Sequence, residues 1–199
     1  NLAGAFCQPN LVVCDTDALN TLPEDIYRDG CAEVIKYGVL YDEALFRILT
    51  LTGLNFDRES VIARCVELKR NVVMEDEFDT GARQKLNLGH TVGHGIEAHS
   101  NFTVSHGKAV AAGMAIVARA GAAWGICDAC TAGQIIETLK IFGLPVSTSL
   151  SSDALYSSSL SDKKRSGAIV NLIVPKAIGH CIIHPLCVEE MKSFIEAGL

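Results

Sequence analysis

The sequence predicts a mainly α protein with a small β-hairpin near its C-terminus. Apolar residues recur at three- and four-residue spacing over most of residues 15–144, which is typical of helices. Longer β-branched runs occur only around Pro175–Gly179. With 199 residues, 49% of them hydrophobic, and a mean hydropathy of +0.26, the chain can bury one core. We therefore expect residues 1–199 to form a single domain.

The N-terminal part is expected to hold one strand or extended segment and two helices. Leu11–Cys14 is a short β-branched run, which predicts a strand or an extended segment. Thr21 stands before Leu22 and Pro23, and this order is typical of a helix start. Gly30 interrupts the helical pattern that follows, so we expect two helices on either side of it.

Three further helices are predicted in the middle of the chain. The stretch "GKAVAAGMAIVARAGAAWGI" is apolar nearly all round, which predicts a central, buried helix. The stretch "TAGQIIETLKIFGLP" ends with Gly143 and Pro145, a common helix stop. The earlier stretch "ESVIARCVELKRNVVMEDE" is amphipathic, and its predicted buried face consists of Val61, Ile62, Cys65, Val66, Leu68 and Val72.

The composition changes after residue 146. Residues 147–167 are rich in serine and are compatible with either a loop or a short helix. The stretch "AIVNLIVPKAIGHCIIH" predicts a hairpin, and "CVEEMKSFIEAGL" predicts a last helix. A Gly-rich dinucleotide turn of the form G-x-G-x-x-G does not occur in the sequence, so the main binding unit for any nucleotide is expected elsewhere.

Charge and cysteine content restrict the possible partners. A net charge of -6 argues against nucleic acid, which requires clustered Lys and Arg, and the longest apolar stretch is too short for a membrane span. The eight cysteines are scattered through apolar runs, which favours reduced thiols and a cytoplasmic location. Cys127 and Cys130 form a lone C-x-x-C, and we interpret this pair as helix packing rather than as a redox or metal site.

Four of the six histidines lie between Leu86 and Gly107. His90 and His94 are four residues apart, so a helix places them on one face, and His106 follows a loop that can bring it back toward them. Such a cluster, joined by a carboxylate, suits a zinc ion with open coordination positions. The carboxylate candidate is Glu33, which lies in an otherwise apolar helix.

Each of these histidines, taken alone, is more often a structural or surface residue, as we expect for His99. Gly89 and Gly93 favour the metal-binding interpretation over a structural or surface role for the histidines. Each precedes a histidine in the predicted helix, where glycine costs about 1 kcal/mol relative to alanine. A helix tolerates this cost where another group must approach its backbone closely.

Several separated segments resemble the C-terminal half of 3-dehydroquinate synthase, in the same order and at similar spacing. These segments are "NLAGAFCQP", "DTDALNTLP", "AEVIKYG", "LKRNVVMEDEFDTGARQKLNLGHTVGHGIEAH", "HGKAVAAGM" and "DKKRSGAIVNLIVPKAIG". The resemblance covers nearly the whole chain and implies the multi-helical fold of that family's C-terminal domain, with a zinc ion, or alternatively Co²⁺, held by Glu33, His90 and His106.

The resemblance also implies the other site residues. His94, Lys36 and Lys69 correspond to catalytic positions, with His94 as the proton carrier. Positions that contact the substrate in the family correspond to Asn1, Lys36, Lys69, Arg83, Asn87, His94 and Lys164. Lys163 is the alternative to Lys164 for the phosphate contact. Arg83 also has a structural alternative, because it can pair with one of the acidic residues at 75–79.

The family converts 3-deoxy-D-arabino-heptulosonate 7-phosphate to 3-dehydroquinate and phosphate in the shikimate pathway, with NAD as cofactor and commonly as a homodimer. NAD is bound mainly by an N-terminal domain that we expect to be absent from residues 1–199, so this chain alone is expected to be inactive. Two alternatives remain: another sugar-phosphate cyclase, of the 2-deoxy-scyllo-inosose or 2-epi-5-epi-valiolone synthase type, and a non-catalytic helical binding module. Glycerol-dehydrogenase-type enzymes resemble the sequence less, because they usually carry an aspartate at the position of Glu33.

Overall fold

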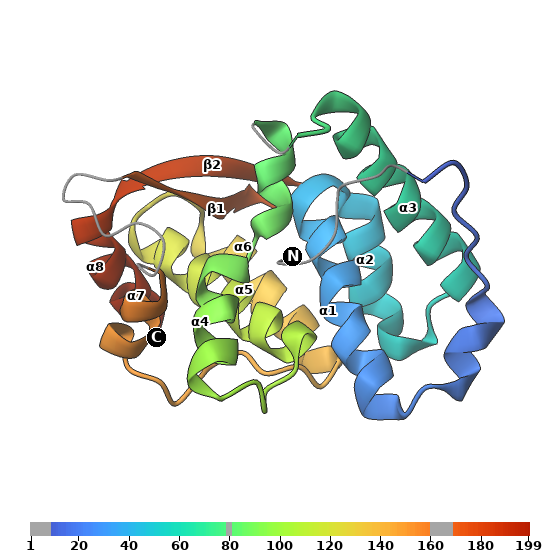
Figure 1. Cartoon of the computed structure of the whole chain (residues 1–199), viewed down its shortest axis with the longest axis horizontal. Coiled ribbons are helices and arrows are strands. Elements are labelled where there is room, and N and C mark those ends of the chain that lie inside the picture. Colours follow the sequence, from blue (N-terminus) through green and yellow to red (C-terminus); the bar gives the residue numbers. More distant parts are fainter. Residues whose placement is uncertain (1–8, 79–80, 160–168) are drawn as a thin grey trace.

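The helix α5, His106–Ala123, forms the centre of the protein. A computed structural model of the chain describes residues 9–78, 81–159 and 169–199. In it, α5 packs against α1 (Glu24–Tyr41), α4 (His90–His99), α6 (Ala129–Ile141) and the C-terminal helix α8 (Val188–Gly198). Figure 1 shows α5 between α4 and α1. The prediction of a central buried helix over this stretch is confirmed, as is the mainly α class.

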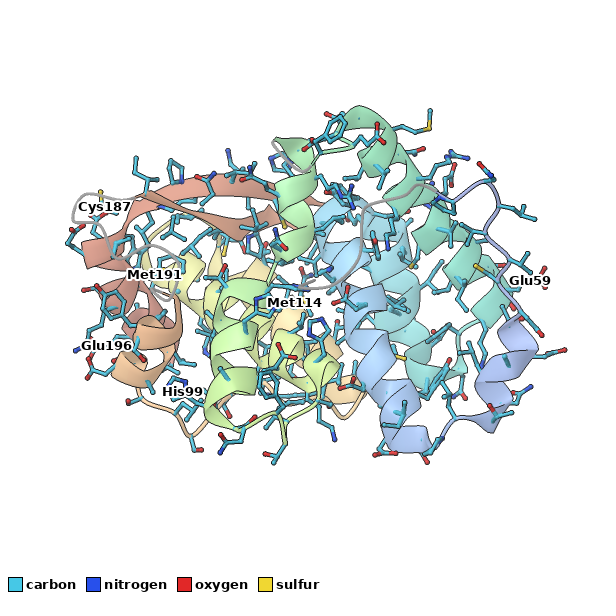
Figure 2. All side chains as sticks on the ribbon, in the orientation of Figure 1. Glu59, His99, Met114, Cys187, Met191 and Glu196 are labelled. Carbon is cyan, nitrogen blue, oxygen red and sulfur yellow. The ribbon has the colours of Figure 1, made fainter. Side chains whose placement is uncertain are left out.

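The remaining elements surround this group. The helices α2 and α3 lie beside α1, away from α4, and α3 forms one edge of the molecule with Glu59 at its outer surface (Figures 1 and 2). The helix α7 packs against α4 and α8. The bounds of these elements are Glu43–Thr52 for α2, Arg58–Glu75 for α3 and Ser152–Ser159 for α7, with the 3-10 helices η1 Thr16–Thr21, η2 Gly53–Asn55 and η3 Ala82–Asn87.

The predicted hairpin is confirmed. The strand β1, Ile169–Ala177, pairs antiparallel with β2, His180–Cys187, and Ile173 lies opposite Ile183. The turn contains Gly179, which adopts a φ of 78°, and its N–H donates to the carbonyl of Val39 at the end of α1 (3.0 Å). This hydrogen bond ties the hairpin to the helix that carries Glu33.

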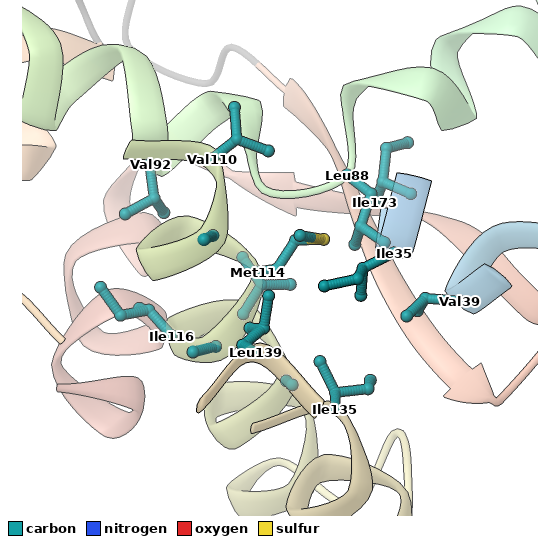
Figure 3. Packing of buried hydrophobic residues seen from close by; sticks show 14 of the residues in the cluster. Ile35, Val39, Leu88, Val92, Val110, Met114, Ile116, Ile135, Leu139 and Ile173 are labelled. Carbon is teal, nitrogen blue, oxygen red and sulfur yellow. The ribbon is translucent and has the colours of Figure 1, made fainter. Parts of the chain in front are cut away.

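The core is formed by side chains from α1, α4, α5, α6 and β1. Figure 3 shows Met114 of α5 at its centre, between Ile35 of α1, Leu139 of α6 and Ile173 of β1. These side chains are at most 3% exposed. Because all of these elements share one core, the helices that carry the candidate ligands are held in fixed positions relative to one another.

Of the two alternatives for Leu11–Cys14, the strand is not formed, since the segment has no partner strand among the described residues and Leu11 and Val13 are about four-fifths exposed. The prediction of a helix break at Gly30 is wrong. Gly30 does not break the helix: α1 continues through it, because the cost of a helical glycine is smaller than the gain from burying Cys31, Ala32 and Ile35 on the same helix.

The predicted faces of the other helices are largely correct. Val61, Leu68 and Val72 of α3 are buried, but Val66 is 42% exposed. At 100° per residue, Val66 lies about 140° around the helix from Val61, and therefore points away from the core. The helix α6 ends as predicted, with Gly143 at a φ of 70°.

The two cysteines of the lone C-x-x-C pair differ in burial. Cys127 is buried and its thiol points to the carbonyl of Ala118, whereas Cys130 is exposed on α6. No helix in the part of the chain that the structure describes has the length and apolar character needed to cross a bilayer.

Candidate metal centre

Glu33 lies on the face of α1 that is turned toward α4 and α5. One of its carboxylate oxygens, Oε2, is 2.6 Å from the ammonium nitrogen of Lys36, a side chain that is only 5% exposed. The other oxygen, Oε1, is buried and has no hydrogen-bond donor among the described residues. A buried carboxylate oxygen without a donor is costly, so this atom is suited to bind a cation.

Two imidazole rings face that oxygen. The Nε2 atoms of His90 and His106 lie 3.6 Å and 3.7 Å from Glu33 Oε1, and the two ring centroids are 5.1 Å apart. One ligand atom from each of the three residues lies within 4.8 Å of the others. In a tetrahedral zinc site two nitrogen or oxygen ligands are about 3.4 Å apart, so the three side chains fit a zinc ion after small adjustments.

The electrostatics of the cluster favour the neutral imidazole that metals require. Burial, and then the nearby ammonium group of Lys36, lower the pKa of His90 to about 4. At neutral pH the ring is therefore uncharged, and its Nδ1–H donates to the carbonyl of Leu88 (3.1 Å). The free Nε2 lone pair points toward Glu33. Burial also lowers the pKa of Lys36, and the carboxylate of Glu33 opposes this shift.

Glycines allow α4 and α5 to approach closely enough for this cluster. Gly113 of α5 faces the backbone of Gly89, and a Cβ at position 113 would lie 2.1 Å from the Gly89 carbonyl oxygen. Gly93 faces Ala109 in the same interface. Gly89 is not inside the helix as predicted: it precedes α4 with a φ of 77°, which glycine adopts without strain. The expectation that these glycines permit close approach is correct.

The start of α5 is held by a carboxylate of α1. Asp29 accepts hydrogen bonds from the N–H groups of Gly107 (3.1 Å) and Lys108 (2.8 Å), and from the hydroxyl of Ser105. Asp29 lies one helical turn before Glu33, and His106 is the first residue of α5. This contact therefore fixes the distance between the Glu33 carboxylate and the His106 ring.

The remaining predicted residues surround the cluster at different depths. His94 is exposed on α4, with its ring centroid 5.5 Å from that of His90 and 6.2 Å from that of His106. Lys69 is exposed on α3, and its charge contributes to the lowered pKa of Lys36. Asn87 ends η3 and is exposed, three residues before His90.

Arg83 contacts the acidic segment at residues 75–78 through hydrogen bonds that involve the backbone rather than through an ion pair. Its guanidinium donates to the backbone carbonyl of Glu77 (2.7 Å), and its backbone N–H donates to the Asp76 carboxylate (3.0 Å). Two other predicted residues, Asn1 and Lys164, lie outside the described residues, as does Lys163.

Sequence reasoning missed two residues next to the cluster. Asp29 is one of them, and Glu97 is the other: its Oε1 lies 3.1 Å from Nδ1 of His106. For Glu97 a signal was present, because it lies seven residues after His90 and three after His94, on the same face of α4. Asp29 had no comparable signal, since its partners are 76 to 79 residues away along the chain.

The comparison with protein families decides the family. The model of the 3-dehydroquinate synthase C-terminal family matches residues 30–165. The chain belongs to this family. A 3-dehydroquinate synthase from Pelobacter propionicus is 41% identical over 201 residues, covering 97% of this chain and 56% of the relative. One from Streptococcus suis is 39% identical over 205 residues, covering 98% of this chain and 57% of that relative. The chain thus spans little more than half the length of these relatives.

Solved structures share the fold. A 2-epi-5-epi-valiolone synthase from Streptomyces hygroscopicus, with NAD⁺ and Zn²⁺ bound, superposes with a TM-score of 0.80 at 21% identity, covering 92% of this chain and 53% of that one. A 2-deoxy-scyllo-inosose synthase, in complex with carbaglucose-6-phosphate, NAD⁺ and Co²⁺, superposes with a TM-score of 0.83 at 21% identity. The match covers 100% of this chain and 59% of that one. The predicted multi-helical fold of the 3-dehydroquinate synthase C-terminal domain is thereby confirmed.

Proposed function

We propose that this chain supplies the metal- and substrate-binding half of a 3-dehydroquinate synthase, which converts 3-deoxy-D-arabino-heptulosonate 7-phosphate to 3-dehydroquinate and phosphate. The observation that carries the proposal is the approach of Glu33, His90 and His106, from three helices, around a buried carboxylate oxygen that has no donor in the part of the chain that the structure describes. A non-catalytic helical module would have no reason to bury that oxygen unpaired.

The identity of the substrate is supported by the comparisons. Relatives named 3-dehydroquinate synthase are 39–41% identical to the chain, whereas the two other cyclases that share the fold are 21% identical. In this proposal NAD is bound mainly by the part of the relatives that the chain does not span. The chain by itself is then expected to bind metal but to turn over little or no substrate.

The residues of the chain have distinct roles in this proposal. Lys36, Lys69 and Arg83 provide cationic groups for the carboxylate and phosphate of the substrate, with Asn1, Asn87 and Lys164 as further contacts. His94 is exposed beside the two ligand histidines and accepts the proton of a substrate hydroxyl. When bound, a divalent cation acts as a Lewis acid on substrate oxygens, and NAD accepts and returns a hydride.

The first test is the metal content of the purified chain. We expect about one zinc ion per chain in the wild type, and loss of that zinc in His90→Ala and in His106→Ala, because each removes one of three protein ligands. His99→Ala is the matched control: it also lies on α4 but outside the ligand set, and should keep the metal. A folded wild type that binds no zinc would contradict the proposal.

The second test measures the reaction. Phosphate release from the heptulosonate phosphate is followed in the presence of NAD, with the N-terminal half of a relative supplied as a separate chain or as a fusion. Activity that requires both halves, and that disappears in Glu33→Gln, is the expected result. Activity on glucose 6-phosphate instead would assign the chain to an inosose-forming cyclase.

A further inference from the structure

Glu97 is a partly buried neighbour of the candidate metal centre. It lies on α4 two helical turns after His90, and its side chain is 15% exposed. Its Oε1 is 3.1 Å from Nδ1 of His106, on the opposite side of that ring from Glu33. A carboxylate accepts hydrogen bonds and does not donate them, so the proton of the neutral His106 ring lies on Nδ1.

The same arrangement is found at the other ligand histidine. Nδ1–H of His90 donates to the carbonyl of Leu88 (3.1 Å), and this leaves Nε2 directed at Glu33. The two rings therefore present the same nitrogen to the candidate metal position. The difference is the acceptor behind each ring, which is a neutral carbonyl for His90 and a carboxylate for His106.

We propose that Glu97 is a positioning residue that holds His106 in the orientation and tautomer required to bind the metal. The proposal rests on the metal centre of the proposed function. His106 needs such support more than His90, because its side chain is 47% exposed whereas that of His90 is 14% exposed. Packing fixes the buried ring, but an exposed ring at the start of a helix needs a hydrogen bond to stay in place.

Glu97 could instead belong to a second cation site, because His94, Glu97 and His106 also bring one ligand atom each within 4.8 Å of the others. Two observations favour the supporting role. The Glu97 oxygen already accepts a hydrogen bond from His106, whereas Glu33 Oε1 has no donor among the residues that the structure describes. In addition, both sites use His106, and a neutral imidazole offers only one lone pair to a metal.

The test compares zinc affinity, measured by competition with a chromogenic chelator, in the wild type, Glu97→Ala and Glu97→Gln. We expect Glu97→Ala to weaken zinc binding about 10- to 100-fold, the usual effect of losing such a partner. Glu97→Gln keeps an oxygen that accepts from Nδ1–H and should recover most of that loss. The matched control is Glu137→Ala, which removes an exposed helical glutamate of α6.

A second measurement does not depend on the metal. In the metal-free chain at about pH 8, the ring nitrogens of His106 are observed by ¹⁵N NMR, with His106→Gln for assignment. The wild type and Glu97→Gln should hold the proton on Nδ1, and Glu97→Ala should move it toward Nε2, which free imidazole side chains prefer. A merely structural effect of residue 97 would not change this tautomer.

The outcomes separate this inference from the proposed function. A wild type that binds zinc, together with a Glu97→Ala variant that has unchanged affinity and tautomer, overturns the role of Glu97 alone. Two zinc ions per wild-type chain would also overturn it, because Glu97 would then be a ligand. A folded wild type without zinc overturns the proposed function and this inference with it.

Discussion

Two groups of helices in this protein begin in different ways. The helices α2, α3 and α6 each start behind an aspartate that caps its own helix: Asp42, Asp57 and Asp128 accept from backbone N–H groups three residues ahead. The helices α4 and α5 follow Gly89, which has no side chain, and Ser105, whose hydroxyl does not cap its own helix. The start of α5 is instead capped by Asp29 from α1.

The two kinds of cap have different consequences for the candidate site. A local cap satisfies the helix end wherever the helix lies, so it fixes the helix but not its neighbours. A cap that comes from another helix also fixes the distance between the two elements. The helix α5 begins with His106, so the helix end that relies on a cap from another helix carries a candidate ligand.

The largest expected effect comes from the contact between α4 and α5. In Gly113→Ala the new Cβ would lie 2.1 Å from the carbonyl oxygen of Gly89, and backbone cannot move aside as a flexible side chain can. We expect a loss of about 3 kcal/mol or more in the free energy of unfolding. Urea unfolding of the purified variants measures it.

Two further glycines make this a graded series. The Cβ of Gly93→Ala would lie 3.2 Å from the backbone of Ala109, which predicts an intermediate loss and gives a folded variant if Gly113→Ala does not fold. Gly133 of α6 has nothing within 4 Å, so Gly133→Ala should stabilise the chain by about 0.5–1 kcal/mol. Equal stability of all three variants would show that α4 and α5 are not in such close contact.

An intermediate effect is expected for the cap that crosses between helices. Asp29→Ala removes the acceptor for Gly107 and Lys108, and should lower the free energy of unfolding by about 1–2 kcal/mol. It should also weaken zinc binding, because His106 is no longer held against α1. Asp128→Ala, which removes the local cap of α6, should cost about 1 kcal/mol and leave zinc affinity unchanged. If both variants lose zinc equally, the distinction between the two kinds of cap is wrong.

The smallest effect is expected at a local cap, and it depends on pH. Burial by itself raises the pKa of Asp42, but hydrogen bonds from Leu45 and Arg64 outweigh it and hold the pKa below its usual value. The contribution of this carboxylate is therefore fully present above the usual aspartate pKa and is lost as the pH falls through the lower, folded-state pKa. Asp42→Ala should cost about 1 kcal/mol at pH 7, and the difference from the wild type should shrink below about pH 4.

Asp42→Asn separates the cap from the charge. The amide oxygen still accepts from Leu45 N–H, so stability at pH 7 should fall less than in Asp42→Ala, and the difference from the wild type should change with pH in the same direction. Thermal unfolding between pH 2 and pH 7 measures both variants. A wild-type advantage that grows as the solution becomes more acidic would contradict the lowered pKa of Asp42.

The sequence by itself determined the class of the fold and most of its elements. Periodicity identified α3, a stretch that is apolar nearly all round identified α5, and the stop at Gly143 and Pro145 identified the end of α6. The β-branched, partly alternating run identified the hairpin. Sequence reasoning failed where local rules compete with packing, as at Gly30, where burial of the rest of α1 outweighs the cost of the glycine. It left open whether Leu11–Cys14 is a strand or an extended segment, because a strand needs a partner that the residue pattern does not supply. The spacing of the histidines and the isolated charge of Glu33 were enough to suggest candidate ligands.

Only the tertiary structure decided which atoms meet. Three features follow from the approach of α1, α4 and α5. Glu33 Oε1 faces two imidazoles and has no donor among the described residues, Asp29 caps a helix far along the chain, and Glu97 contacts His106. Such contacts join residues whose separation in sequence carries no periodic signal. Their geometry depends on differences of a few tenths of an ångström in helix packing, which the residue pattern alone does not specify.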